Sequence, residues 1–378
     1  GGSYPCRQVI DRLTRFYRSR KVQPYAPYPA AQTAGAEMDE ARRRMAAILN
    51  VGEDELHFGP STSQNTYVLA RAFAGLLRPG DAIVVTDQDH EANSGAWRRL
   101  EAEGIEIREW QVDPETGHLD PARLAPLIDG RLRLVAFPHC SNIVGEINPV
   151  AEICATIRAA GAWSCVDGVS SAPHGFPDVT ALGADIYLFS SYKTYGPHQG
   201  LMCVRRELAE RLPNQGHFFN AGSLTARLTP AGPDHAQIAA CAGMADYVEA
   251  LHETALKGGG NGRSPARAVH DAMRARERLL MAPLLDFLRG RNDLRLIGPD
   301  RPEGRAPTIA IAHDRPGEAL AADLAAHGIM AGGGHFYAWR LVSALGLDPE
   351  HGVLRLSFTH YTHEAEIDRA IEALDRVL

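Results

Sequence analysis

Residues 163–200 read WSCVDGVSSAPHGFPDVTALGADIYLFSSYKTYGPHQG, and the rest of the chain is organised around this stretch. Two short apolar runs lie in it: residues 163–166 lead to Asp167, and residues 186–189 lead to Ser-Ser-Tyr and Lys193. Short apolar runs bounded by turn-forming residues are typical of buried strands in a parallel sheet. Ligands bind at the carboxyl ends of such strands. The sequence therefore predicts a carboxylate and an amine at the ligand-binding edge of one sheet.

Lysine is scarce in this chain. Lysine and arginine together number 39, yet the only lysines are Lys21, Lys193 and Lys257. Arginine keeps its proton in proteins, whereas lysine can lose it and attack a carbonyl carbon to form a Schiff base. Lys21 lies in a basic stretch typical of a solvated helix face, and Lys257 precedes three glycines. Because only Lys193 follows a buried strand, we interpret it as a reactive amine rather than a surface lysine.

The composition is that of an ordinary globular enzyme. A chain of 378 residues with 45% hydrophobic and 22% charged residues can form one large or two medium domains. The net charge of −7, without a long basic block, argues against a nucleic-acid surface. No apolar run is long enough to cross a bilayer. The six cysteines form no C-x-x-C pair, so we expect reduced core residues and a cytoplasmic protein.

Strands separated by helices recur between residues 81 and 204, a pattern that predicts an α/β fold with a mostly parallel sheet. No G-x-G-x-x-G sequence follows any of these strands, which disfavours a dinucleotide-binding fold. We predict an N-terminal arm over residues 1–34, a large domain over residues 35–258 and a smaller C-terminal α+β domain over residues 259–378. The glycine-rich loop at 258–263 marks the last boundary.

Hydroxyl side chains gather where another helix is expected to begin. Ser61, Thr62 and Ser63 precede an apolar helical run, so they are placed at a helix N-terminus. Free amide groups at such an N-terminus bind phosphate. Capping alone would account for one hydroxyl, whereas three in a row favour a phosphate site.

A second polar cluster follows the strand at residues 81–86. We interpret His90 as an aromatic ring that stacks against a flat ligand. The cluster of Asp87, Asp89, His90 and Glu91 also allows a different hypothesis, a metal-dependent hydrolase. Adjacent loop residues seldom converge on one ion, and the spacing of a zinc site is missing, so we predict no metal.

Together these candidates match the needs of pyridoxal 5′-phosphate (PLP). The aldehyde requires an amine such as Lys193, and the ring nitrogen requires an anion such as Asp167 to stay protonated. The phosphate would be held by the helix amides and by Thr62 and Ser63. Asn142 follows a further buried strand and is placed at the same edge.

The chain resembles class V aminotransferases of PLP fold type I, and specifically their cysteine desulfurase-like branch. The resemblance covers essentially the whole chain and is carried, in order, by the segments FGPSTSQNT, DQDHEANSGAW, PHCSNIVGEINPV, CVDGVSSAPH, SSYKTYGPHQG and VLRLSFTHYTHEAEID. It implies the PLP-dependent transferase fold, with a large domain that carries the cofactor and a smaller C-terminal domain. It also implies a homodimer with shared active sites that acts on a small amino acid.

The resemblance implies a role for each candidate residue. Lys193 carries the cofactor, Asp167 pairs with the ring nitrogen and His90 stacks on the ring. Arg355 binds the substrate carboxylate through two parallel hydrogen bonds. The remaining cofactor contacts it implies are Thr62, Ser63 and Ser190 at the phosphate, Asn142 and Ser170 beside the ring, and Gly232 from the partner at the phosphate.

The departures from the branch concern sulfur chemistry. Desulfurases carry a nucleophilic cysteine on a small-domain loop, but the matching residues 331–338 contain none, and no cysteine follows Cys241. Tyr192 stands where a histidine usually precedes the lysine. Ser170 replaces a frequent glutamine, and Gly232 replaces a frequent threonine. Persulfide transfer by the usual route is therefore not expected.

These observations favour β-elimination, or cleavage of a C–S or C–Se bond, on a cysteine-like amino acid, with Lys193 as the general base. Transamination or epimerisation of a small amino acid is the alternative, and a catalytically idle cofactor-binding protein is another. Tyr192 and His335 are the residues whose chemistry would decide between the reactions.

Overall fold

The computed structural model describes residues 2–230, 232–259 and 263–378. Seven strands form the larger sheet in the order β1-β7-β6-β5-β4-β2-β3. All run in the same direction except β7, which is antiparallel to β1 and β6. The α/β class and the mostly parallel sheet are thus confirmed. The strands are β1 (Leu56–Gly59), β2 (Ala82–Thr86), β3 (Glu106–Trp110), β4 (Leu132–Pro138), β5 (Trp163–Asp167), β6 (Ile186–Ser190) and β7 (Gly200–Val204).

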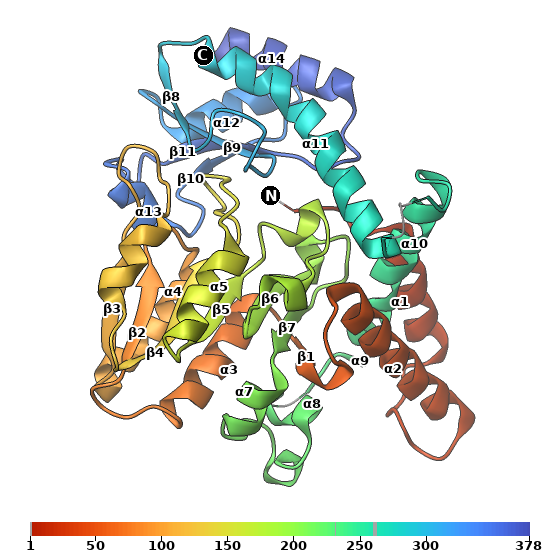
Figure 1. Ribbon diagram of the computed structural model, residues 1–378. Coiled ribbons are helices and arrows are strands. Elements are labelled where there is room, and N and C mark those ends of the chain that lie inside the picture. The colour runs from red at the N-terminus through yellow and green to blue at the C-terminus, as the bar shows by residue number, and fades with distance from the viewer. Residues whose placement is uncertain (1, 231, 260–262) are drawn as a thin grey trace.

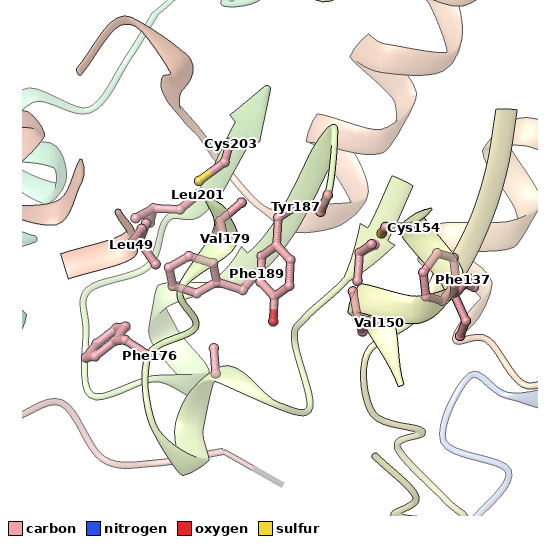
Figure 2. Packing of buried hydrophobic residues seen from close by; sticks show 14 of the residues in the cluster. Leu49, Phe137, Val150, Cys154, Phe176, Val179, Tyr187, Phe189, Leu201 and Cys203 are labelled. Atoms are coloured by element: carbon pink, nitrogen blue, oxygen red, sulfur yellow. The ribbon is translucent and has the colours of Figure 1, made fainter. Parts of the chain in front are cut away.

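The central strands are buried on both faces of this sheet. Along β6, Ile186 and Leu188 belong to the apolar core on one face, while Tyr187 and Phe189 belong to the core on the other. Figure 2 shows the second core, in which Tyr187 and Phe189 lie among aliphatic and aromatic side chains. Burial of both faces explains why these strands are continuous apolar runs in the sequence.

Helices cover both faces of the larger sheet (Figure 1). Those of the larger part of the chain are α1 (Arg7–Ser19), α2 (Pro29–Leu49), α3 (Thr62–Ala74), α4 (Glu91–Arg98), α5 (Val150–Ala159), α6 (Val179–Leu182), α7 (Arg206–Arg211), α8 (Leu224–Arg227), α9 (His235–Ala240) and α10 (Ala242–Thr254). Helices α3, α4 and α7 contribute to one core, and α2 and α5 to the other.

A second sheet follows in the C-terminal part of the chain. Its order is β10-β11-β9-β8, and all its pairs are antiparallel. Its elements are α11 (Pro265–Arg289), β8 (Leu294–Ile297), β9 (Thr308–His313), α12 (Gly317–Ala326), β10 (Gly332–Gly334), α13 (Trp339–Ala344), β11 (Val353–Ser357) and α14 (Glu364–Val377). Helices α11, α12 and α14 share an apolar core with β9 and β11. The division at residues 34/35 and 258/259 stays a prediction, and residues 260–262 of the expected boundary loop lie outside the described residues.

The structure differs from the sequence-based expectation in several elements. The residue pattern predicts an amphipathic helix over residues 36–49, but this helix begins at Pro29, because the missing N–H of proline is tolerated at the first helical position. The pattern also predicts one helix over residues 238–251, where the structure has two helices that meet at Cys241. The short strands β1 and β10 were not predicted, since three or four residues carry too little periodicity. No described helix is long and apolar enough to cross a membrane.

Helices α3 and α4 pack against each other through one aromatic contact. Trp97 of α4 is fully buried, and its ring meets Phe73 of α3 edge to face at 5.4 Å between centroids. We predict that Trp97→Ala lowers the free energy of unfolding by about 3–5 kcal/mol, because it leaves a large cavity. Urea unfolding measures this, with the exposed Phe218→Ala as the control. Equal losses in the two variants would contradict the prediction.

Candidate active site

The polar residues of the site follow neighbouring parallel strands. In the sheet register, Pro138 at the end of β4 lies opposite Asp167 at the end of β5. Ser190 ends β6, and a short 3-10 turn, Ser191–Lys193, follows directly. The strand ends thus bring the carboxylate of Asp167 and the amine of Lys193 to one edge of the sheet, as the sequence predicts.

At this edge lies an open cavity with about 450 Å³ of empty space. Its lining contains most of the predicted site residues and several that were not predicted. The predicted ones are Thr62, Ser63, His90, Asn142, Asp167, Ser170, Ser190 and Lys193. Asp89, Cys140 and Tyr192 line it as well. Sequence segments more than 100 residues apart therefore meet in one cavity.

Asp167 and Lys193 influence each other's charge. Burial raises the pKa of Asp167 to about 6, against a hydrogen bond of 2.8 Å from the amide of Val169 to Oδ1 and against the nearby Lys193 amine. Burial also lowers the pKa of Lys193, helped by Arg355 and opposed by Asp167. A lowered pKa increases the fraction of neutral amine, which is the nucleophilic form.

His90 stands at the start of α4. Its Nδ1 accepts a hydrogen bond of 3.0 Å from the amide of Ala92, so the ring caps the helix and is held in place. Burial, together with the charges of Lys193 and Arg355, lowers its pKa to about 4. The imidazole is therefore neutral near neutral pH. On its other side the ring of Tyr337 lies 5.3 Å away, tilted by 34°.

A pair of hydroxyls marks the start of α3. Thr62 Oγ1 and Ser190 Oγ lie 2.8 Å apart, so one donates to the other. Ser61 caps the helix by accepting a hydrogen bond from the amide of Gln64. A Cβ atom at Gly200 would lie 2.4 Å from the carbonyl carbon of Ser61, so only glycine lets α3 begin this close to β7. Ser63 is exposed at the cavity wall.

The second sheet contributes Arg355 from β11. Its Nη1 donates to the carbonyl oxygen of Asn142 at 3.0 Å, and the ring of Phe336 lies 3.8 Å from the guanidinium carbon. Burial lowers the pKa of Arg355 to about 10. Asn142 Nδ2 donates to the carbonyl of Phe336, whereas Asn142 Oδ1 is buried without a hydrogen-bond partner. Such an atom indicates a missing donor.

One predicted residue, Gly232, lies apart from the others. Gly232 does not line the cavity of its own chain; it lies in another groove, beside His217 and Asn220. Its neighbour, residue 231, lies outside the described residues. Tyr192 lies at the cavity wall, and its ring stacks on His198 at 4.4 Å between centroids. The sequence did not predict the contacts of Phe336 and Tyr337, since they depend on the packing of the second sheet against the first.

The four residues of the metal hypothesis do not converge. Asp87 Oδ1 accepts a hydrogen bond from the amide of Val112 at 2.9 Å, and both carboxylate oxygens of Asp89 accept from Asn93 Nδ2. Glu91 instead lies 3.6 Å from Arg340. Across the part of the chain that the structure describes, no three His, Cys, Asp or Glu side chains are arranged to hold a metal ion.

The cavity fits PLP on its own features. It offers an amine, a buried carboxylate for a cationic ring nitrogen, and a pair of hydroxyls at a helix N-terminus for a phosphate. The unpartnered Oδ1 of Asn142 is an acceptor at the same wall. The residues that would hold the group are therefore already assembled.

Comparison with known proteins agrees with this geometry. The family model described as "Aminotransferase class-V" matches residues 1–252 and 266–370. An "Aminotransferase-like protein FGM3" of Gibberella zeae is 33% identical and covers 100% of this chain and 93% of its own length. A cysteine desulfurase of Serratia proteamaculans is 32% identical and covers 98% of this chain and 89% of its own length.

Solved structures share the fold. The apo cysteine desulfurase of Thermococcus onnurineus superposes with a TM-score of 0.86 at 22% identity, covering 99% of this chain and 92% of its own. The cysteine desulfurase CsdA of Escherichia coli gives 0.82 at 23% identity, covering 100% and 92%. With its sequence, cavity and architecture in agreement, the chain belongs to the class V aminotransferase family and is a PLP-dependent enzyme of fold type I, in the cysteine desulfurase-like branch.

Proposed function

We propose that this enzyme cleaves the Cβ–S or Cβ–Se bond of a cysteine-like amino acid by β-elimination, without a protein persulfide. The observation that carries this proposal is a combination. The cavity has the residues of a PLP site, and the loop over residues 331–338, which contacts Asn142 and His90 of the cavity lining, contains no cysteine. The reaction converts the amino acid and one water into pyruvate, ammonia and a thiol or selenol.

The cysteines of the chain support a reaction without persulfide. Cys140 is the one that lines the cavity, but burial raises its pKa to about 12, and its thiol donates to the carbonyl oxygen of Gly145 at 3.4 Å. The thiolate is the nucleophilic form of cysteine, so Cys140 is unreactive. Cys6 is half-buried, and the other four are buried and free.

In this proposal each side chain has a separate task. PLP, when bound, withdraws electrons from the substrate Cα and so makes its proton acidic. Lys193 Nζ would hold the cofactor and, as a free amine, would take the Cα proton of the substrate. Asp167 provides the negative charge opposite the ring nitrogen. His90 holds the ring by stacking, as a neutral imidazole.

Other groups bind and orient. Arg355 binds the substrate carboxylate, since its second guanidinium edge is free of the contact with Asn142. The phosphate is held by Thr62, Ser63 and Ser190 together with the first amides of α3. Asn142 and Ser170, which line the same cavity, would contact the cofactor ring.

We further propose a homodimer in which the partner subunit completes the phosphate site with the segment around Gly232. This residue is distant from its own cavity, has a positive φ of 60° and meets no atom within 4 Å of an added Cβ, so its backbone is open to a second copy. We also propose a cytoplasmic location, since the six cysteines form no disulfide.

Transamination is the second candidate. The observation that favours it is the 33% identity to a protein named aminotransferase-like. It uses the same residues up to the loss of the Cα proton and would differ only in where that proton is returned. Epimerisation differs in the same way.

The attachment site can be tested with the three lysines. We predict that borohydride reduction of the holoenzyme fixes the cofactor on the peptide that contains Lys193, since the amine forms a Schiff base. Peptide mass spectrometry reads the position. Lys193→Ala should lose both the modification and the absorption band near ~420 nm that Schiff-base formation produces, whereas Lys21→Ala and Lys257→Ala keep them. A cofactor fixed on either of these two would show that the assignment is wrong.

The charge of Asp167 predicts a pH dependence. Its pKa of about 6 in the cofactor-free protein means that the carboxyl is protonated below that pH and charged above it. We expect the PLP affinity of the wild type, relative to Asp167→Asn, to rise as the pH increases through 6. A charge-assisted bond of this kind amounts to about 10- to 100-fold. Absorption titration of the apoenzyme measures it. Asp167 raises the pKa of Lys193, so the ratio of the two affinities reports the charge of Asp167 both directly and through Lys193, and a constant ratio would refute the assignment.

The products distinguish the reactions. We predict that S-methylcysteine yields pyruvate, ammonia and methanethiol in equal amounts, and that Cys140→Ser keeps this turnover because its thiol takes no part. Coupled lactate dehydrogenase and a thiol reagent measure the products. Alanine with sulfane sulfur on the protein would instead indicate a desulfurase. A keto acid that retains the sulfur would indicate transamination.

A further inference from the structure

The loop over residues 335–338 contacts two residues of the cavity lining, Asn142 and His90, and has a strained conformation. Phe336 and Tyr337 have φ values of 50° and 59°, in the left-handed region that aromatic residues rarely adopt. Contacts from the larger sheet hold the loop there. Asn142 Nδ2 donates to the carbonyl of Phe336 at 2.9 Å, and the amide of Glu91 donates to the carbonyl of Tyr337 at 2.8 Å. Strain that is held this firmly is typical of ligand sites.

The strained backbone places two rings at the two ends of the substrate site. The Phe336 ring lies on the guanidinium of Arg355, at the proposed carboxylate end. The Tyr337 ring lies 5.3 Å from His90, beside the proposed cofactor ring. A substrate bound by Arg355 at one end and by the cofactor beside His90 at the other would therefore have this loop as a neighbour.

The outer part of the loop is aromatic and open to solvent. Tyr337 is 70% exposed and Trp339 is 46% exposed, although both rings contact His335, at 6.4 and 5.2 Å between centroids. Exposed tyrosine and tryptophan side chains offer large, rigid contact area to a ligand. Three flat side chains, His335, Tyr337 and Trp339, thus lie together just outside the cavity.

We propose that these three rings, His335, Tyr337 and Trp339, select amino acids whose leaving group carries an aromatic ring. Such substrates are S-aryl or S-heteroaryl cysteine conjugates rather than cysteine itself. The inference rests on the proposed β-elimination and names its substrate class. The leaving ring lies against Tyr337 while the carboxylate is bound by Arg355. Lys193 takes the Cα proton. The Cβ–S bond then breaks with its electron pair going to sulfur, and the arylthiolate leaves the cavity. One water then converts the remaining three-carbon fragment to pyruvate and ammonia.

The test compares substrates that differ in the ring alone. S-phenylcysteine and S-methylcysteine report elimination by the holoenzyme. Their analogues homophenylalanine and norvaline carry a methylene in place of sulfur, so they bind without a leaving group, and the shift of the cofactor absorption band gives their affinity. The variants are Tyr337→Ala, Tyr337→Phe, which keeps the ring, and Tyr67→Ala, which removes an exposed tyrosine from α3.

We expect the wild type to prefer each phenyl compound over its methyl analogue. Tyr337→Ala should reduce that preference by about tenfold, the upper value for an aromatic pair, while Tyr337→Phe and Tyr67→Ala retain it. The inference would be overturned if the wild type showed no preference for the phenyl compounds over the methyl compounds. It would also be overturned if Tyr337→Ala had the same preference as the wild type. A change in subunit association of Tyr337→Ala in size-exclusion chromatography would overturn it as well, because the ring would then serve a subunit contact.

The analogues separate this inference from the reaction proposed above. If S-phenylcysteine releases no thiol but homophenylalanine still binds in a Tyr337-dependent way, the β-elimination fails and ring selection stands. If both cysteine derivatives are eliminated with the same efficiency, the reaction stands and ring selection fails.

Discussion

The structure depends on a carboxylate that is buried before any ligand arrives. Removing an ionised group from water is costly unless a partner or hydrogen bonds compensate it. Asp167 has one amide hydrogen bond and the nearby Lys193 amine, and its pKa still rises to about 6. This incomplete compensation leaves the site short of positive charge. A protonated ring nitrogen supplies that charge, and so the site is arranged for a cationic heterocycle.

A second buried carboxylate lies in the same cavity as Asp167. Asp89 lines the same cavity, and burial together with the charge of Asp167 raises its pKa well above the ordinary value. Two like charges this close disfavour double ionisation. Protonation is therefore favoured at Asp89, whose two carboxylate oxygens both face Asn93 Nδ2, while Asp167 lies nearer the Lys193 amine in its electrostatic influence.

The sequence predicted the parts of the site that depend on local pattern. Asp167 and Lys193 were found because each follows a short apolar run, and a doubly covered parallel sheet converts such runs into neighbouring strand ends. The hydroxyls at Thr62 were found because helix capping has a local signature. Arg355 and Gly232 came from family resemblance alone. The first now lies beside Asn142, and the place of the second in a dimer is still a prediction.

What the sequence could not predict depends on contacts between distant segments. Nothing in the residues around Tyr337 indicates a positive φ, since aromatic residues avoid that region. The conformation is imposed by Asn142 and by the backbone of Glu91, about 190 and 250 residues earlier in the chain. The start of α2 at Pro29 was missed for the opposite reason, because a local rule against proline was applied at the one helical position where it does not hold.

The same contacts support the proposed reaction, which needs no cysteine on the loop. A nucleophilic thiol has to reach the substrate sulfur, which requires a loop that moves. Here the loop is bound at two backbone carbonyls and its Phe336 ring covers Arg355. A loop fixed in this way shapes and orients a side chain but is poorly suited to carry sulfur away. In the proposed β-elimination the reaction ends with the departure of the thiolate itself, and the group on sulfur is then the part of the substrate that the rings of His335, Tyr337 and Trp339 would select.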